Sequence, residues 1–370
     1  MHKTYHAIGL MSGSSLDGLD VAYCRLDWDG SSVTEWELLN AETLSFSEIW
    51  VKRLAALPEQ NALTFAQTNI YFAYYMGDLV NEFINKHQIG AVDFIASHGH
   101  TIFHDPSKRY SVQIGNGNAL AATTKKTVIC DFRMQDVALN GEGAPLAPLA
   151  DAYLFPGYDF YMNIGGIANI SAQYEGKWVA FDVAPANQIF NFLSEKVGKP
   201  FDKDGEIASS AKPHPEFLED LQSLDFFGKT YPKSMGNEWI RKEVLPLFTS
   251  SGLPLEDQMA TAVELLVQET ATAIGLIRKQ EHWPESSAKM LLSGGGTYNK
   301  FFVERLSKAM RAINIDIMIP ESAVINYKEA LLMALLGLLR LEEKPNSMPS
   351  VTGAKRATVN GGIYFGGYFI

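Results

Sequence analysis

The sequence predicts an α/β chain built from two similar domains, and three observations support this. Strand-like and helix-like segments alternate along the chain, which is typical of α/β proteins. The length of 370 residues suits two domains of roughly 100–200 residues each. A pair of strands joined by a polar or glycine-rich turn stands near the start of each half of the chain, so the two halves have a similar layout.

The first half begins with a predicted hairpin. Residues 5–10 are a strand candidate, residues 11–18 form a Ser/Gly/Asp-rich turn, and residues 20–28 alternate in polarity as a second strand does. Between residues 66 and 87, apolar side chains recur at helical spacing. Residues 92–97 then predict a short buried strand that ends at a glycine turn.

The second half repeats this beginning. Residues 158–181 predict a second hairpin, with Gly165 and Gly166 at its tip. Residues 257–279 predict a helix with Asp257 as its N-cap. The remaining expectations are a strand over 290–293 that leads into three glycines, helices over 300–312 and 327–341, and a connector over 342–352.

The composition limits the classes of function. With 46% hydrophobic residues, 20% charged residues and a net charge of −11, the chain predicts a globular protein with no general attraction to nucleic acid. The two cysteines, Cys24 and Cys130, lie in apolar segments and indicate buried reduced thiols. The apolar run 330–339 is too short to span a bilayer and predicts a core helix. Since no signal peptide is recognisable, we expect a cytoplasmic protein without membrane contact.

Three segments are candidates for binding phosphate or a nucleotide, since glycine lets a ligand approach the backbone and small polar residues add donors. An ordinary tight turn remains the alternative for the first two, and a flexible loop for the third. Asp17 could reach phosphate only through Mg²⁺. The candidate residues are Ser12, Gly13, Ser14, Ser15, Leu16, Asp17, Gly18, Leu19 and Asp20 in the first segment, Asn163, Gly165 and Gly166 in the second, and Gly294, Gly295, Gly296 and Asn299 in the third.

Other polar groups are candidates for recognising a second ligand or for catalysis. Asp182 follows a predicted strand and could act as a general base, or it could simply form a turn. The segment with His98, Gly99, His100 and Thr101 could bind zinc, but hydrogen bonding to sugar hydroxyls fits it better because further metal ligands are not evident. Arg133 offers a planar fork suited to a carboxylate, with a structural ion pair as the alternative.

Taken together, the motifs resemble those of the anhydro-N-acetylmuramic acid kinase family. The matching stretches include GLMSGSSLDGLDVA from Gly9, SHGHTIFH from Ser97, NIGGIANIS from Asn163, YPKSMG from Tyr231 and LSGGGTYN from Leu292. Further matches are DFRMQD, GEGAPLAP, FDVAPAN, DKDGEIA, EDQMATAVELL, KEA and PSVTGAKR, so the resemblance covers nearly the whole chain.

The resemblance implies two actin/hexokinase-like, that is ribonuclease H-like, domains flanking an active-site cleft. It implies a kinase that uses ATP and Mg²⁺ to hydrolyse the 1,6-anhydro ring of anhydro-N-acetylmuramic acid and to phosphorylate O6, in the recycling of cell-wall peptidoglycan. Asp182 would be the base that activates water, and the three glycine-containing segments would bind ATP, with Asp17 contacting Mg²⁺ indirectly. Arg133 and Glu329 would face the sugar together with residues 98–101, and a homodimer would be expected.

The sequence also departs from the family pattern. Ala184-Pro185-Ala186 stands where two glycines are usual, which would restrict the backbone near Asp182. Ser14 replaces a threonine, and His100 replaces a glutamine. Two rival functions remain open: a plain hydroxyl kinase of another amino sugar, and a non-catalytic ATP-binding module on the same fold. We expect residues 1–130 and 345–370 to form the first domain and residues 131–344 the second.

Overall fold

The structure is a computed structural model that describes residues 2–13 and 15–367. Its contacts divide the chain into two compact units, Met1–Pro156 with Asn326–Ile370 (unit 1) and Gly157–Ile325 (unit 2). These limits differ from the expected boundaries at 130 and 345. The structure places residues 131–156 in unit 1, where Arg133 and Asp136 bond to groups of that unit, and most of the long helix α13 belongs there too.

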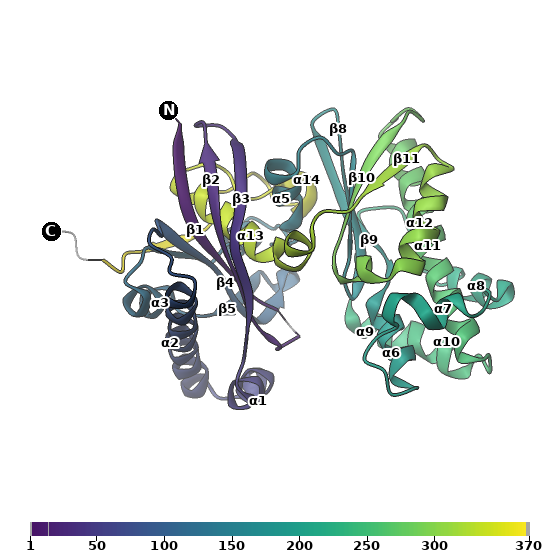
Figure 1. Ribbon diagram of the computed structural model, residues 1–370, viewed down its shortest axis with the longest axis horizontal. Helices are drawn as coiled ribbons and strands as arrows, with labels where there is room; N and C mark the ends of the chain where they lie inside the picture. The colour runs from purple at the N-terminus through teal and green to yellow at the C-terminus, as the bar shows by residue number, and fades with distance from the viewer. Residues whose placement is uncertain (1, 14, 368–370) are drawn as a thin grey trace. The chain divides into compact units, whose positions relative to one another are not determined.

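Unit 1 is built around a seven-stranded sheet with the order β12-β6-β4-β1-β2-β3, in which β5 pairs with β4 (Figure 1). The first three strands are antiparallel, whereas β4 runs parallel to β1 and β6 runs parallel to β4. Its strands are β1 (Lys3–Ser12), β2 (Gly18–Trp28), β3 (Val33–Ser45), β4 (Phe94–Asp105), β5 (Tyr110–Ile114), β6 (Val128–Cys130) and β12 (Gly362–Tyr364), and its helices are α1 (Glu48–Ala56), α2 (Ala62–Lys86), α3 (Gly117–Thr124), α4 (Met134–Ala138), α5 (Ala147–Leu154), α13 (Ser322–Leu341) and α14 (Pro349–Thr352).

The two faces of β1 bury different elements, because successive side chains of a strand point to opposite faces. Ile8 and Leu10 are buried in one cluster with apolar residues of α2 and α3. Gly9, on the other face, lies so close to α13 that a Cβ there would stand 1.8 Å from the Ala330 carbonyl oxygen. Ten consecutive residues of α13, from Ala330 to Leu339, are buried. The expected core helix at this position is therefore confirmed.

Unit 2 has a five-stranded sheet with the order β11-β10-β7-β8-β9. Again the first three strands are antiparallel, and two further strands run parallel to β7 on its other side. Its strands are β7 (Phe160–Ile164), β8 (Ile167–Tyr174), β9 (Lys177–Pro185), β10 (Ala288–Ser293) and β11 (Ile315–Met318), and its helices are α6 (Asn187–Glu195), α7 (Glu206–Ser209), α8 (Pro215–Gln222), α9 (Asn237–Trp239), α10 (Leu245–Ser250), α11 (Leu255–Gln280) and α12 (Lys300–Arg311).

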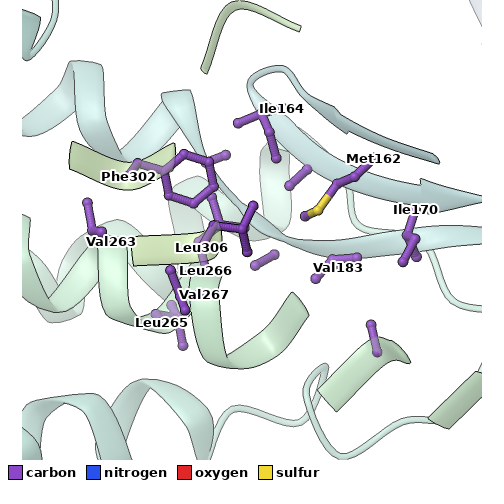
Figure 2. Close-up of a cluster of buried hydrophobic side chains, with 14 of the residues drawn as sticks. Met162, Ile164, Ile170, Val183, Val263, Leu265, Leu266, Val267, Phe302 and Leu306 are labelled. Carbon is purple, nitrogen blue, oxygen red and sulfur yellow. The ribbon is translucent and has the colours of Figure 1, made fainter. Parts of the chain in front are cut away.

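The core of unit 2 lies between this sheet and the long helices α11 and α12. Figure 2 shows Val263 and Leu266 of α11 and Phe302 of α12 close to Met162 and Ile164 of β7. By length and composition α11 and α13 could each cross a membrane. Both are instead largely buried within the two units, as core helices of globular proteins are.

Five strands of unit 1, β3-β2-β1-β4-β6, thus have the same order and directions as β9-β8-β7-β10-β11 of unit 2. This confirms the predicted α/β class with two ribonuclease H-like sheets. Two local predictions were wrong. The strand that begins near residue 92 does not end at the glycine turn but continues through Gly99 to Asp105, since β5 pairs with its second half. Helix α11 begins at Leu255 after Pro254, so Asp257 lies in the first turn and is not the N-cap.

Candidate functional site

The β1–β2 hairpin of unit 1 ends in a short polar loop. The Ser15 hydroxyl donates to the Asp17 carboxylate at 2.6 Å, and the Ser12 hydroxyl lies 2.9 Å from Nδ1 of His100 on β4. Leu16 has a φ of 60°, in the left-handed region. Ser14 lies outside the described residues. The loop therefore presents hydroxyl and carboxylate groups at the carboxyl end of β1.

The rest of this segment is part of β2. Gly18 is buried, and a Cβ there would come within 2.6 Å of the Leu44 carbonyl oxygen. Leu19 is fully buried in the core, so its side chain cannot meet a ligand. Asp20 accepts a hydrogen bond from the Thr43 hydroxyl at 2.5 Å, and burial followed by the nearby Asp17 charge raises its pKa.

His98 and His100 of β4 are buried and have separate partners. His98 accepts a hydrogen bond at Nε2 from Nε of Arg133 (2.9 Å), and its Nδ1 lies 3.1 Å from the Gly99 carbonyl oxygen. Since Nε2 accepts, the ring proton sits on Nδ1. Burial and then the Arg133 charge lower the pKa of His98 to about 3, so the ring is neutral near pH ~7. Burial lowers the pKa of His100 as well.

This segment is shaped for hydrogen bonding. Gly99 has a φ of 71°, and a Cβ there would stand 2.3 Å from the Ile114 carbonyl oxygen, so glycine is required. Thr101 accepts a hydrogen bond from Gln113 at 3.3 Å. Among the described residues, no group of three or more His, Cys, Asp or Glu side chains could hold a metal ion.

Arg133 is held at two points of its guanidinium group. Besides the bond to His98, its Nη1 donates to the Gly143 carbonyl oxygen at 2.7 Å. The N–H of Gly143 donates to the Asp136 carboxylate at 2.9 Å, and the Thr352 hydroxyl donates to the same carboxylate at 2.9 Å. Asp136 is 1% exposed. The GEGAP and PSVTG motifs thus meet on one buried carboxylate, which fixes the loop that orients Arg133.

Glu329 lies near this guanidinium. Desolvation and then the Asp20 charge raise its pKa, whereas the charges of Arg133 and Lys328 act in the opposite direction. Lys328 itself pairs with Asp151 at 2.6 Å. The structural ion pair that was the alternative for Arg133 is not what fixes its guanidinium, because the partners recorded for it are a neutral ring and a carbonyl oxygen.

In unit 2, Asp182 stands on β9 beside a bulge, since Asn169 pairs with Asp182 and Ala168 pairs with Ala184. Its Oδ2 accepts hydrogen bonds from the backbone N–H of Met235 (2.8 Å) and from the Ser234 hydroxyl (3.1 Å). Burial raises the pKa of Asp182, and these two donors lower it. No hydrogen bond from the described residues reaches Oδ1, so that oxygen can accept a proton.

Alanines stand near Asp182 at two positions where glycine is usual. Ala184 and Ala186 are completely buried in the core of unit 2. Ala186 has a φ of −127° and a ψ of −103°, and neither alanine is among the described residues with positive φ. A left-handed backbone therefore does not require glycine at either position.

The glycine tip of the second hairpin faces the start of helix α6. The carbonyl oxygen of Gly165 accepts from the N–H of Asn187 (3.1 Å), and that of Gly166 accepts from Ala186 (2.9 Å) and Gln188 (3.2 Å). The tip carbonyls therefore satisfy the first N–H groups of the helix, which otherwise lack partners. The tip supports α6 in addition to any contact with a ligand.

The third glycine segment follows β10 and packs against the end of β7. Gly294 has a φ of 86°, and a Cβ there would stand 2.6 Å from Oδ1 of Asn163. A Cβ on Gly296 would come within 2.1 Å of Ile164. Asn299 caps α12 by accepting from the Phe302 N–H at 3.0 Å.

A cavity of about 700 Å³ opens beside this segment. Of the predicted residues, Gly295, Gly296 and Asn299 line it. Sequence reasoning missed its aromatic walls, Phe201 and Tyr298, which are 56% and 46% exposed. The DKDGEIA motif, which follows Phe201 directly, was the signal that could have located one of them.

The repetition of one ribonuclease H-like strand order in two units is the construction of the actin/hexokinase-like fold, and this chain has that fold. Within this fold class its family is shown by comparison with known proteins. A family model described as "Anhydro-N-acetylmuramic acid kinase" matches residues 5–366. The chain therefore belongs to the anhydro-N-acetylmuramic acid kinase family, as its motifs indicated.

Several relatives carry this name. The protein from Sulfurimonas denitrificans is 32% identical, over 96% of this chain and 98% of the relative. The protein from Pasteurella multocida is 32% identical, over 98% and 97%. The protein from Pseudomonas syringae pv. syringae is 34% identical, over 96% and 98%. Among solved structures, the activator of 2-hydroxyisocaproyl-CoA dehydratase from Clostridium difficile, with bound ADPNP, aligns over 91% of this chain and 96% of its own at 13% identity and a TM-score of 0.42.

Proposed function

We propose that this protein is the ATP-dependent kinase that opens the 1,6-anhydro ring of anhydro-N-acetylmuramic acid and yields N-acetylmuramic acid 6-phosphate and ADP. The observation that carries the proposal is the Asp182 carboxylate, whose Oδ1 is without a hydrogen bond from the described residues while Oδ2 is held by Ser234 and Met235. A base must be fixed in orientation and must still have an oxygen that can take a proton.

The proposed reaction couples attack of water at C1 to transfer of the γ-phosphoryl group to O6. Water loses a proton to Oδ1 of Asp182, and its oxygen forms a bond to C1 of the sugar. The C1–O6 bond breaks, O6 forms a bond to the γ-phosphorus of ATP, and the bond from that phosphorus to the ADP oxygen breaks. Burial raises the pKa of Asp182, which favours proton uptake by the carboxylate.

For ATP, we propose the three segments predicted from the sequence. The cavity of about 700 Å³ in unit 2 has the size of a site for a drug-sized ligand, and its exposed aromatic walls suit a flat purine ring. The phosphates would be contacted by the polar tip of the β1–β2 hairpin and by Gly165-Gly166. Asp17 would contact Mg²⁺ indirectly, through Mg-ATP. Mg²⁺ bound with ATP would offset the negative charge of the phosphates.

For the sugar, we propose His98, Gly99, His100, Thr101, Arg133 and Glu329. Both ring nitrogens of His98 are engaged, by Arg133 and by the Gly99 carbonyl oxygen, so His98 would act by holding Arg133. His100 would use Nε2, the ring nitrogen that does not face Ser12, to bind a sugar hydroxyl. Arg133 is held at Nε and Nη1, so its remaining Nη2 is available to a carboxylate such as that of the lactyl group. We further propose a cytoplasmic location, where ATP is available, and a homodimer.

The test is ADP release from Mg-ATP with anhydro-N-acetylmuramic acid, in water enriched in the heavy oxygen isotope and with the product mass measured. The proposal expects ADP together with one heavy oxygen at C1. Phosphorylation without incorporation of solvent oxygen would instead identify a plain hydroxyl kinase. ADP release that does not depend on the sugar would identify an ATP-binding module.

A further inference from the structure

The YPKSMG motif forms a loop that lies along the free edge of β9. This strand is at the end of the sheet order, so one of its edges is not paired with another strand. The N–H of Asp182 donates to the Lys233 carbonyl oxygen at 3.2 Å, and the next two residues of the loop bond to the Asp182 side chain. Three consecutive loop residues are therefore bonded to one residue of β9.

The loop is anchored independently of Asp182. The Tyr231 ring stacks on Phe181 with centroids 4.9 Å apart and planes 6° apart, and its hydroxyl donates to Glu281 at 2.7 Å. Met235 is 6% exposed and belongs to the core of unit 2. Loss of the Ser234 hydroxyl would therefore leave the loop in place.

The charged side chain of the loop points elsewhere. The Lys233 ammonium lies 4.6 Å from the centroid of the Phe226 ring and donates to the Phe226 carbonyl oxygen at 3.4 Å. Burial lowers the pKa of this ammonium group, and the charge of Glu269 raises it. The pKa of the Asp182 carboxyl group is raised by burial and lowered by the hydrogen bonds from the Met235 N–H and the Ser234 hydroxyl. The Lys233 charge is not among these causes.

We infer that Ser234 is a positioning residue, whose hydroxyl acts with the Met235 N–H to hold Oδ2 of Asp182 and so directs Oδ1 toward the proton it accepts. The inference rests on the proposed function, in which Asp182 is the base. With two donors on one oxygen the carboxylate is fixed about its terminal torsion, which is otherwise broad. With one donor the carboxylate can rotate, and either oxygen can then accept the hydrogen bond from the Met235 N–H.

Loss of the Ser234 hydroxyl should also change the ionisation of Asp182. A hydrogen bond to the charged form of a carboxyl group lowers its pKa. Removal of the Ser234 hydroxyl should therefore raise the pKa of Asp182, and the acidic limb of the rate profile should move to higher pH. A serine that only stabilised the loop would not move this limb.

The test compares Ser234→Ala and Ser234→Thr with the control Ser223→Ala, whose hydroxyl donates to a backbone carbonyl oxygen on the surface of the same unit. On the acidic limb we expect kcat of Ser234→Ala to fall by about tenfold, the lower end of the loss for a hydrogen bond to a charged group, with KM changed less than about twofold. Ser223→Ala should behave as the wild type, and Ser234→Thr, which keeps the hydroxyl, should keep the acidic limb at the pH of the wild type.

A second measurement does not need activity. Carboxyl carbon NMR titration of the full chain, with the Asp182 signal assigned from its absence in Asp182→Asn, should show a higher pKa in Ser234→Ala than in the wild type and in Ser234→Thr. Equal titration curves in all three proteins would overturn the inference. If the wild type releases no ADP with the anhydro sugar, the proposed function fails, while the titration still decides whether Ser234 acts on Asp182.

Discussion

The two hairpins of the molecule occupy the same place in two sheets of the same strand order, but their tips differ in chemistry. In unit 1 the β1–β2 loop is polar, and its Ser12 hydroxyl lies beside a buried imidazole of β4. In unit 2 the tip is Gly165-Gly166, and its carbonyl oxygens bond to the start of α6.

The functional groups elsewhere in the two units also differ in chemistry. Unit 1 gathers neutral histidines and the Arg133 guanidinium, which are groups that recognise a polar ligand. Unit 2 carries the Asp182 carboxylate and an aromatic-walled cavity. The two sheets therefore carry different functional groups on a common strand order. Unit 1 would bind the sugar, whereas unit 2 would supply the base and bind the purine ring.

The sharpest way to test this division is Asp182→Asn in unit 2. The amide keeps the size of the side chain and an oxygen for the Ser234 and Met235 donors, but it cannot take up the proton. We expect kcat to fall by about 10³-fold, within the range for general base catalysis, with binding of ATP and sugar retained. ADP release and calorimetric titration measure the two effects.

The control is Asp225→Asn, which alters a carboxylate of the same unit that is 96% exposed and should leave the rate unchanged. Full activity of Asp182→Asn would refute the assignment of the base. Loss of ligand binding together with the rate would show that the carboxylate is structural.

The second prediction concerns the glycine segment of unit 2. Because Gly294 has a φ of 86° and its Cβ would stand 2.7 Å from the Ile164 carbonyl oxygen, Gly294→Ala should lower the free energy of unfolding by about 3 kcal/mol. Gly275→Ala is the matched control, since a Cβ there meets nothing within 4 Å in helix α11. This control should raise stability by about 0.5–1 kcal/mol. Urea unfolding midpoints measure both, and equal midpoints would contradict the prediction.

The third prediction tests recognition by unit 1. Lysine at position 133 cannot bond both His98 and Gly143 while still offering a planar fork. We therefore expect Arg133→Lys to raise KM for the sugar by about 30-fold, as for a lost charge-assisted hydrogen bond, without a change in KM for ATP. Arg53→Lys, an exposed cation over the Trp50 ring, serves as the control. An equal rise in both KM values would argue against separate roles for the two units.

The repeated hairpins and the core helices could be predicted from the sequence, because polarity patterns and glycine turns are local signals. Features that depend on contacts between distant segments could not be predicted from it. The extension of β4 past Gly99 depends on pairing with β5. The hydrogen bonds from Ser234 to Asp182 and from Thr352 to Asp136 join residues 52 and 216 positions apart, and no periodicity reveals such pairs.

The glycine motifs were also read too simply from the sequence. Gly294 and Gly296 were expected to approach a ligand, yet the structure shows that each is first required by close packing on the end of β7. Conversely, Ala184 and Ala186 stand where the family pattern has glycines, and neither has the positive φ that would require one. Conformation decides whether a glycine is needed, and composition alone does not report it.

The smallest expected effect concerns the pH dependence of stability, through His98 in unit 1. Its folded pKa of about 3 lies below the unfolded value of about 6.5, so below that value the unfolded chain binds a proton that the folded chain does not. Stability is therefore lost as pH falls. In His98→Gln, the free energy of unfolding should fall less between about pH 7 and about pH 5.5, by about 1 kcal/mol. Urea titrations at both pH values measure this difference, with the exposed His282→Gln of unit 2 as the control. If the two variants lose stability equally, the buried histidine is not neutral in the folded protein, and Nε2 cannot be the acceptor that the hydrogen bond from Arg133 requires.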